Sequence, residues 1–235
     1  MKVIVVFIRH GFSCANAIEK SGNILEQYKR LFYVDPPLTN YALNKISPMK
    51  KKYNSVKFDY ILSSTMIRAE ETALSLFPNK QILVVPYIKE INFGFDNVIT
   101  DNPTEQLDKI NKKLNKENLN YYYSTTKNDE WLKTSHLSDY DKFKDIILTD
   151  IVRKTTFRNG KRTITIAVIT HSNFMKDIFK TQNKPNNVGS GIKVYNYENN
   201  YITEINQIPE KNSMFDKYDG TVIPDKVRSF DIITC

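Results

Sequence analysis

Cysteine is scarce in this chain: its 235 residues include only two, Cys14 and Cys235. Two cysteines so far apart match neither the spaced ligand sets of zinc sites nor the disulfide framework of small secreted proteins. Such cysteine usage is typical of a reducing compartment. We therefore predict a cytoplasmic location.

Long apolar runs are missing as well. No run approaches the ~20 residues that a membrane-spanning helix needs. The apolar stretch at the start of the chain covers residues 3–8 and is too short for a secretory signal peptide. We expect no membrane partner.

Acidic residues are fewer than basic ones: 26 Asp and Glu against 34 Lys and Arg leave a formal net charge of +8. This surplus suits anionic partners such as phosphate esters or nucleic acid. The basic residues are scattered along the chain, however, which is typical of a solvated surface and makes nucleic acid the less favoured partner. The sequence leaves the oligomeric state open.

Hydrophobic residues make up 40% of the chain, which supports a folded core. Predicted strands alternate with predicted helices, and this order favours an α/β fold: a three-layer sandwich with a mostly parallel central sheet and helices on both faces. The strands are expected at 3–8, 58–62, 81–85 and 163–169, with a late hairpin at 193–197 and 201–205. Helices are expected at 13–20, 40–51, 67–77, 142–152 and 172–179.

The length fits one domain, residues 1–235, with an insertion. Residues from about 96 to 140 are rich in Asn, Lys, Asp and Tyr and have few periodic apolar positions. We interpret this segment as a mostly helical cap. A polar tail is expected after about residue 209.

Local signals suggest how the helices begin and how the cap is anchored. Residues 101–104 are suited to start a helix that runs to Leu114, and Ser63–Thr65 offer capping side chains for the helix after the second strand. The aromatic residues Tyr121–Tyr123 and Trp131 could attach the cap to the body.

Reactive or phosphate-binding residues follow four predicted strands. Arg9 and His10 follow the first strand, and Arg68 lies just beyond the second. Glu90 lies beyond the third strand, and His171 comes directly after the fourth. Because ligand sites in such sheets form beyond the carboxyl ends of the strands, we expect these side chains to meet in one crevice.

A histidine beside arginines is suited to phosphoryl transfer. A nucleophilic His10 must be uncharged at the attacking nitrogen, and Arg9 and Arg68 would lower its pKa. We expect its other ring N–H to be fixed by a backbone carbonyl. A protonated His171 would join the arginines in neutralising the phosphoryl oxygens. Glu90 would protonate the leaving oxygen and then take a proton from water.

Two small residues flank these groups. Gly11 would let the backbone turn sharply and approach a ligand. The N-termini of the helices after Gly11 and at Ser172 would add backbone donors for a bound phosphate.

Several of these residues also have an ordinary interpretation. Arg68 could pair with Glu70 or Glu71 on its own helix. Glu90 could be a surface carboxylate, and His171 could be a core histidine. Convergence from segments so far apart in the chain favours a site.

Five segments occur in an order that resembles the histidine phosphatase superfamily, also called the phosphoglycerate mutase-like family. The segments are Arg9-His10-Gly11 with Ser13 and Asn16, Asp35-Pro36-Pro37-Leu38-Thr39, Ser63-Ser64 with Arg68-Ala69, Lys89-Glu90-Ile91-Asn92-Phe93-Gly94, and Thr170-His171-Ser172. The resemblance covers about residues 1–205. It implies a phosphohistidine intermediate, with no metal and no other cofactor. The catalytic residues are then His10, Glu90, His171, Arg9 and Arg68, and the substrate-binding residues are Asn16, Ser13, Gly11 and Ser172.

The chain also departs from the family pattern. Phe12 replaces an acidic residue, Ser172 replaces a common glycine, and 88–94 lacks the arginine-, histidine- and tyrosine-containing acidic stretch of the mutases. We therefore predict a phosphatase for phosphomonoesters, acting on a phosphorylated small molecule or, as a second possibility, a phosphoprotein. A phosphoglycerate-type phosphomutase and a non-catalytic module that binds phosphate or nucleic acid are the alternatives.

Overall fold

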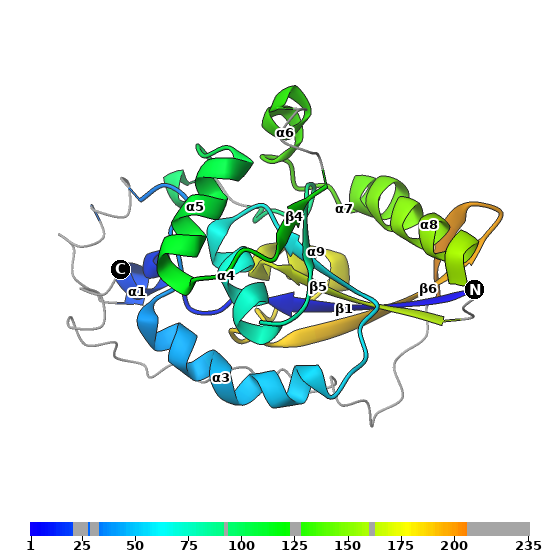
Figure 1. Cartoon of the computed structure of the whole chain (residues 1–235), viewed down its shortest axis with the longest axis horizontal. Coiled ribbons are helices and arrows are strands. Elements are labelled where there is room, and N and C mark those ends of the chain that lie inside the picture. The colour runs from blue at the N-terminus through cyan, green and yellow to red at the C-terminus, as the bar shows by residue number, and fades with distance from the viewer. Residues whose placement is uncertain (21–27, 29–32, 92–93, 123–127, 160–162, 206–235) are drawn as a thin grey trace.

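The computed structural model describes residues 1–20, 28, 33–91, 94–122, 128–159 and 163–205. Across them a single sheet runs in the order β4-β3-β2-β5-β1-β6-β7 (Figure 1). The strands are β1 Lys2–Arg9, β2 Tyr60–Ser64, β3 Ile82–Val85, β4 Leu119–Tyr121, β5 Thr163–Thr170, β6 Ser190–Glu198 and β7 Tyr201–Ile205. Strands from β4 to β1 run parallel, and β6 and β7 add an antiparallel edge. The mostly parallel sheet and the late hairpin are confirmed.

The pair β1 and β5 forms the centre of the sheet. The two strands pair in parallel over their whole length, from Lys2 opposite Thr163 to Arg9 opposite Thr170. Most of their side chains are buried on both faces, which explains the unbroken apolar runs in the sequence. Because the pairing ends at Arg9 and Thr170, the residues that follow the two strands emerge side by side.

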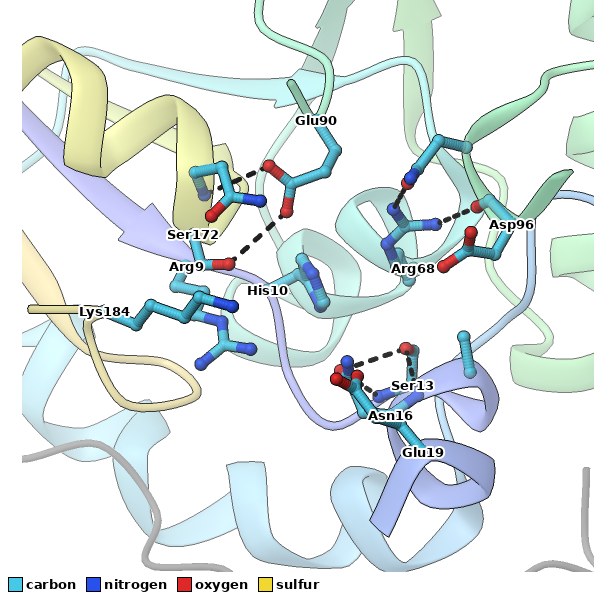
Figure 2. Close-up of a pocket in the computed structure, with 13 residues that line it drawn as sticks. Arg9, His10, Ser13, Asn16, Glu19, Arg68, Glu90, Asp96, Ser172 and Lys184 are labelled. Carbon is cyan, nitrogen blue, oxygen red and sulfur yellow. Dashed lines mark hydrogen bonds between the residues drawn. The ribbon is translucent and has the colours of Figure 1, made fainter. Parts of the chain in front are cut away.

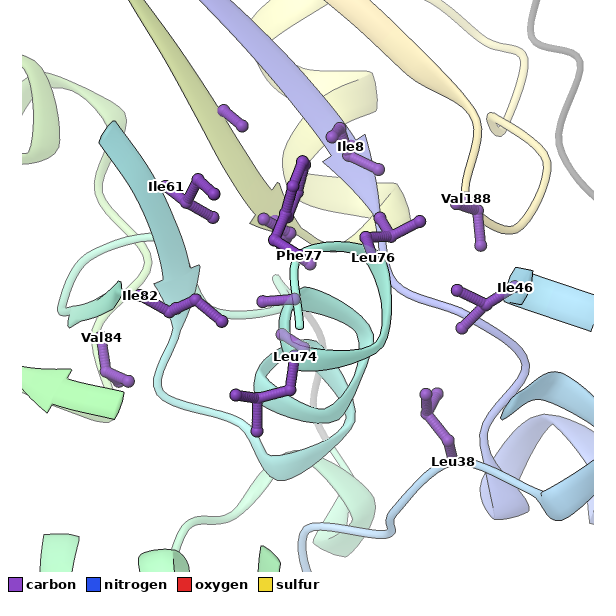
Figure 3. Close-up of a cluster of buried hydrophobic side chains, with 14 of the residues drawn as sticks. Ile8, Leu38, Ile46, Ile61, Leu74, Leu76, Phe77, Ile82, Val84 and Val188 are labelled. Carbon is purple, nitrogen blue, oxygen red and sulfur yellow. The ribbon is translucent and has the colours of Figure 1, made fainter. Parts of the chain in front are cut away.

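Helices cover both faces of the sheet. They are α1 Cys14–Lys20, α3 Asn40–Asn54, α4 Ile67–Leu76, η1 Phe95–Asn97, α5 Pro103–Leu114, α6 Asn128–Thr134, α7 Tyr140–Lys142, η3 Phe143–Leu148, α8 Thr149–Asn159 and α9 Ser172–Phe179. One hydrophobic cluster packs α3 and α4 against one face through Ile46 and Leu74 (Figure 3). A second cluster packs η3, α8 and α9 against the other face through Ile147 and Met175. The three-layer α/β sandwich is therefore confirmed.

The segment expected as a cap, 96–140, is only partly separate from the sheet. It supplies α5 and α6 as expected, but also β4, which pairs with β3 and extends the sheet. Trp131, with Tyr121 packed against it, belongs to the hydrophobic cluster that contains Leu74 of α4, and the two rings meet edge to face with centroids 5.2 Å apart. Both residues thus contact the body of the protein, as expected. Tyr123 lies outside the described residues. A strand of three residues is too short to leave a periodic signal in the sequence.

The helix predicted over 142–152 is interrupted by a wider turn. The residues Phe143–Leu148 form a π-helical turn between α7 and α8. Ile147 and Ile151 are buried, whereas Ile146 is 43% exposed. One face of this helix meets the sheet, and the wide turn leaves Ile146 off that face.

Other predicted elements agree with the structure to within a few residues. The second strand lies at 60–64 instead of 58–62, and the backbone N–H of Asp59 donates to Thr165 O (2.8 Å) just before the strand begins. In the described part of the chain, no helix is long and apolar enough to cross a membrane. The cytoplasmic location and the division into one domain with a cap stay predictions, and the tail after about 209 lies outside the described residues.

The start of α5 provides a test of the fold. The side-chain Oδ1 of Asn102 accepts hydrogen bonds from the backbone N–H groups of Thr104 (2.9 Å) and Glu105 (3.0 Å). We expect Asn102→Ala to lower the free energy of unfolding by about 1 kcal/mol, because these donors lose their partner. Urea unfolding followed by circular dichroism measures the loss. An equal loss in Lys112→Ala, an exposed position on the same helix, would contradict this assignment.

Candidate active site

The carboxyl ends of β1 and β5 place two histidines next to each other. The backbone N–H of His10 donates to Thr170 O (2.9 Å), so the chain stays tied to β5 just after β1 ends. The ring centroids of His10 and His171 are 5.0 Å apart. The exposed fractions of the two residues are 3% and 0%. The expected meeting of the two strand ends is thus found.

The ring of His10 is held by its own backbone neighbour. Its Nδ1 lies 2.6 Å from Gly11 O, so Nδ1 carries the proton and Nε2 is left without one. Burial lowers the pKa of His10 well below its usual value, and Arg68 and Arg9 lower it further. Both the carbonyl partner and the direction of the shift agree with the sequence-based predictions. An uncharged His10 with a bare Nε2 is a competent nucleophile.

Arg68 lies at the start of α4 beside His10 (Figure 2). Its Nη1 donates to Asp96 O (3.0 Å), and its Nη2 donates to Asn97 Oδ1 (2.7 Å). The alternative that Arg68 pairs with Glu70 or Glu71 on its own helix is wrong. Glu71 forms its ion pair with Lys113, and Glu70 Oε2 accepts a hydrogen bond from the Tyr121 hydroxyl (3.5 Å).

Asp35 organises the helix end that carries Arg68. Both of its carboxylate oxygens accept the backbone N–H of Ile67 (3.2 Å each), and Gln106 Nε2 donates to it as well (3.3 Å). Its Oδ1 lies 3.9 Å from Arg68 Nη1. Burial raises the pKa of Asp35 to about 7, although Arg68 and the Ile67 N–H act in the opposite direction.

The prediction that a side chain of Ser63–Thr65 caps this helix is therefore wrong. Ser63 and Ser64 belong to β2, and the N-cap residue Met66 has no side-chain hydrogen bond. The cap is supplied by Asp35, which is too distant in the chain to be identified from a local pattern.

The loop after α9 holds Arg9. Its Nη1 donates to Pro185 O (2.8 Å), its backbone N–H donates to Gly189 O (2.9 Å), and its carbonyl accepts the N–H of Val188 (3.1 Å). Val188 is fully buried and has a φ of 60°, a conformation that β-branched residues rarely adopt. Tyr53 reaches this loop from α3, and its hydroxyl donates to Val188 O (2.7 Å). Several independent contacts therefore maintain the loop against backbone strain.

Glu90 faces the same space from the chain beyond β3. Its Oε1 accepts the backbone N–H of Asn173 (3.0 Å), and its Oε2 accepts the hydroxyl of Ser172 (3.4 Å). The Ser138 hydroxyl donates to Lys89 O (2.8 Å) and fixes the neighbouring backbone. With 8% of its surface exposed, Glu90 is not an ordinary surface carboxylate.

His171 is fully buried and bonded to β2. Its Nε2 lies 2.9 Å from Ser64 Oγ, while its Nδ1 has no hydrogen-bond partner among the described residues. Burial lowers the pKa of His171 well below its usual value, and Arg68 and His10 act in the same direction. The lowered pKa favours a neutral His171 ring in the free protein. The protonated His171 expected with phosphoryl oxygens in place stays a prediction.

A polar pocket of about 100 Å³ opens in front of His10 (Figure 2). It is lined by Arg9, His10, Ser13, Ala15, Asn16, Glu19, Arg68, Glu90, Asp96, Asn97, Ser172, Asn173 and Lys184. Ser13 Oγ donates to Asn16 Oδ1 (3.0 Å), which orients the amide and leaves its NH₂ group as the donor for an anion. Ser13, Asn16 and Ser172 thus lie where the sequence predicts.

Gly11 differs from the expectation. Its backbone N–H donates to Thr72 Oγ1 (2.9 Å), so it does not serve a ligand. A Cβ at this position would lie 2.9 Å from Ile46 Cδ1 and 3.3 Å from Leu38 Cδ2. Close packing against these side chains, rather than a sharp turn toward the substrate, accounts for the glycine.

Some residues around the pocket carry no signal in the sequence. Asp96 and Asn97 reach it from η1, Lys184 reaches it from the loop after α9, and Glu19 reaches it from the end of α1. Asn173 is the exception, since it directly follows the predicted Thr170-His171-Ser172 segment. The remaining residues could not be selected without knowing how the loops fold back.

One group of donors has a spacing that could surround a metal ion. Ligand atoms of His10, Glu90 and His171 lie within 4.8 Å of one another. The guanidinium groups of Arg9 and Arg68 share this space, and their positive charge favours an anion over a cation. The donor set therefore fits a phosphoryl group better than a metal.

Comparison with known families gives a clear match. A sequence model of the histidine phosphatase superfamily (branch 1) matches residues 5–187 of the 235. The chain belongs to the histidine phosphatase superfamily. The resemblance seen in its motifs is thereby confirmed. A search of curated proteins finds no match.

Solved structures share the fold of this histidine phosphatase superfamily member. Mycobacterial hydrolase 1 is 12% identical with a TM-score of 0.52, and the match covers 87% of this chain and 96% of that one. A mycobacterial glucosyl-3-phosphoglycerate phosphatase is 13% identical with a TM-score of 0.50, covering 86% and 96%. A phosphoglycerate mutase from Bacillus anthracis is 17% identical with a TM-score of 0.49, covering 87% and 92%. At these identities the likeness to the two mycobacterial structures shows the fold alone.

The raised pKa of Asp35 has a consequence for stability. A carboxyl group with a pKa of about 7 in the folded protein and about 3.8 when unfolded binds more protons in the folded state between these pH values. Stability from this group is therefore present at low pH and is lost as the pH rises through 7. We expect the free energy of unfolding of Asp35→Asn, relative to that of the parent protein, to increase by a few kcal/mol from pH 5 to pH 8, because the amide does not titrate.

Urea unfolding at a series of pH values measures this difference. Asp145→Asn, whose side chain is 64% exposed in the parent protein, is the control for loss of a carboxylate. A parallel pH dependence of Asp35→Asn and the parent protein would rule out the assignment.

Proposed function

We propose that this protein is a phosphatase that hydrolyses phosphomonoesters through a phosphohistidine on His10. The observation that carries the proposal is the state of the His10 ring. Its Nδ1 is bonded to Gly11 O, which leaves the bare Nε2 for a substrate in the pocket that His10 lines. Arg9 and Arg68 share that pocket and supply positive charge for a phosphoryl group.

The reaction proceeds in two displacements. In the first, Nε2 of His10 attacks phosphorus, the bond between phosphorus and the ester oxygen breaks, and the protonated Glu90 carboxyl gives its proton to that oxygen. In the second, the Glu90 carboxylate takes a proton from water, the water oxygen attacks phosphorus, and the bond between phosphorus and Nε2 breaks. The arginines neutralise the equatorial oxygens in both transition states, so we propose that no metal is required.

The pocket favours a small substrate. Its volume is about 100 Å³, and nearly all of its lining residues are polar or charged. Such a space accepts a phosphoryl group with a short polar leaving group and offers little apolar surface to an aromatic one. We therefore propose a phosphorylated small molecule as the substrate, ahead of a phosphoprotein.

Removal of the nucleophile tests the proposal. We expect His10→Ala to reduce phosphate release from a panel of sugar phosphates, phosphorylated acids and nucleotides by roughly 10³-fold or more, because the covalent route is lost. Acid quenching of the parent protein with ³²P-labelled substrate is expected to trap label on His10.

The exposed His136, outside the pocket, provides the control variant His136→Ala. Equal release by His10→Ala and His136→Ala would refute the mechanism. Label passed to an added sugar acid instead of water would indicate a phosphomutase.

Substrates whose leaving groups differ in their need for a proton test the role of Glu90. Nitrophenolate leaves without a proton, so Glu90→Gln should form the phosphohistidine from nitrophenyl phosphate at nearly the parent rate. Without a base for the water, however, hydrolysis of this intermediate should slow by about 10²- to 10⁴-fold. We expect a burst of one nitrophenolate per protein followed by a slow steady state in stopped-flow absorbance.

For alkyl phosphates, Glu90→Gln should lose activity without a burst. Glu19→Gln, at the pocket rim, is the matched control. Equal losses for aryl and alkyl phosphates with no burst would argue against Glu90 as the acid and base.

A further inference from the structure

Ser64 and His171 form a buried pair whose hydrogen bond has two possible directions. Both residues are 0% exposed, and Ser64 Oγ lies 2.9 Å from His171 Nε2. We propose that Ser64 is a positioning residue that donates to Nε2 and so fixes the neutral His171 ring with its proton on Nδ1. On the basis of the proposed function, that Nδ1–H is the group that His171 offers to the phosphoryl oxygens.

The two directions differ in what they leave unpaired. If Ser64 accepted a proton from Nε2, its own hydroxyl proton would need another acceptor, and the described residues provide none for it. Nδ1 would then present a lone pair to the phosphoryl oxygens, which also carry lone pairs. If Ser64 donates, its hydroxyl proton is used and Nδ1–H remains available as a donor. Each direction leaves one buried donor unpaired in the free protein, either the Ser64 hydroxyl or Nδ1–H. Donation by Ser64 is favoured because only then is the unpaired donor Nδ1–H, for which a phosphoryl oxygen can become the acceptor.

The position of Ser64 follows from the sheet. Ser64 is the last residue of β2, which pairs in parallel with β5 up to Ser63 opposite Ile169. The strand end thus places the Ser64 hydroxyl against the residue that follows β5. Successive side chains of a strand point to opposite faces, and the hydroxyl of Ser63 donates to Ser64 O (3.0 Å) instead of reaching His171.

The assigned tautomer also suits the surroundings of His171. Ligand atoms of His10, Glu90 and His171 lie within 4.8 Å of one another, a gap that one phosphoryl group can bridge. A neutral Nδ1–H gives a hydrogen bond to that group without adding a third positive charge beside Arg9 and Arg68. His10 can then stay uncharged as the nucleophile.

Nuclear magnetic resonance on the full-length protein reads the tautomer directly. The chain has three histidines, so a ¹⁵N-histidine sample gives few ring signals, and the variants His136→Gln and His10→Gln assign those of His171. Protonated and bare ring nitrogens of a neutral imidazole have well-separated shifts. We expect the proton of His171 on Nδ1 in the parent protein, in Ser64→Thr and in the matched control Ser63→Ala, and a shift toward Nε2 in Ser64→Ala.

A parent protein with His171 protonated on Nε2 would overturn the proposal without any variant. So would a Ser64→Ala spectrum that keeps the parent pattern. Because the first of these results needs no substitution, a poorly folded Ser64→Ala would not weaken the test.

Kinetics separate this inference from the proposed function. We expect kcat/KM to fall roughly 10- to 100-fold in Ser64→Ala, with Ser64→Thr and Ser63→Ala close to the parent protein. Activity that requires His10 but is unchanged in Ser64→Ala would refute the donor role of Nδ1 and leave the phosphatase intact. Absence of any activity that depends on His10 would instead refute the phosphatase, while the spectra still decide the tautomer.

Discussion

The parallel pairing of β1 with β5 is the constraint from which the site is built. The two strands end opposite each other, at Arg9 and Thr170, and the hydrogen bond from His10 N–H to Thr170 O extends the pairing by one step. The residues that follow have no freedom to separate, so His10 and His171 must share one space. The other groups of the pocket arrive by loops and helix ends that fold over this fixed pair.

Buried positive charge is the second determinant. A guanidinium group removed from water needs hydrogen-bond acceptors and a nearby negative charge. Arg68 obtains them from Asp96 O, Asn97 Oδ1 and the carboxylate of Asp35. Burial, together with this charge, lowers the pKa of the neighbouring histidines and so favours their neutral form. The buried arginines that can bind an anion therefore also lower the pKa of His10, which keeps this nucleophile uncharged.

The sequence was sufficient to predict those site residues whose position follows directly from the strand beside them in the chain. His10 and His171 directly follow apolar strands, and α/β topology brings such strand ends together. Asp35 and Ser64 could not be assigned their roles, because each acts on a residue far away in the chain. The charge state of His171 in the free protein could not be predicted for a related reason. Its pKa depends on burial, which sequence pattern alone does not measure.

The strained turn at Val188 affects how Arg9 is oriented before an anion binds. Left-handed backbone at a β-branched residue persists only where surrounding contacts overdetermine it, and here the Tyr53 hydroxyl and the backbone of Arg9 supply those contacts. The loop therefore has little freedom to rearrange when an anion arrives. The Arg9 guanidinium, bonded to Pro185 O in that loop, is already oriented before the encounter. The entropic cost of ordering this arginine is met during folding and not at each binding event.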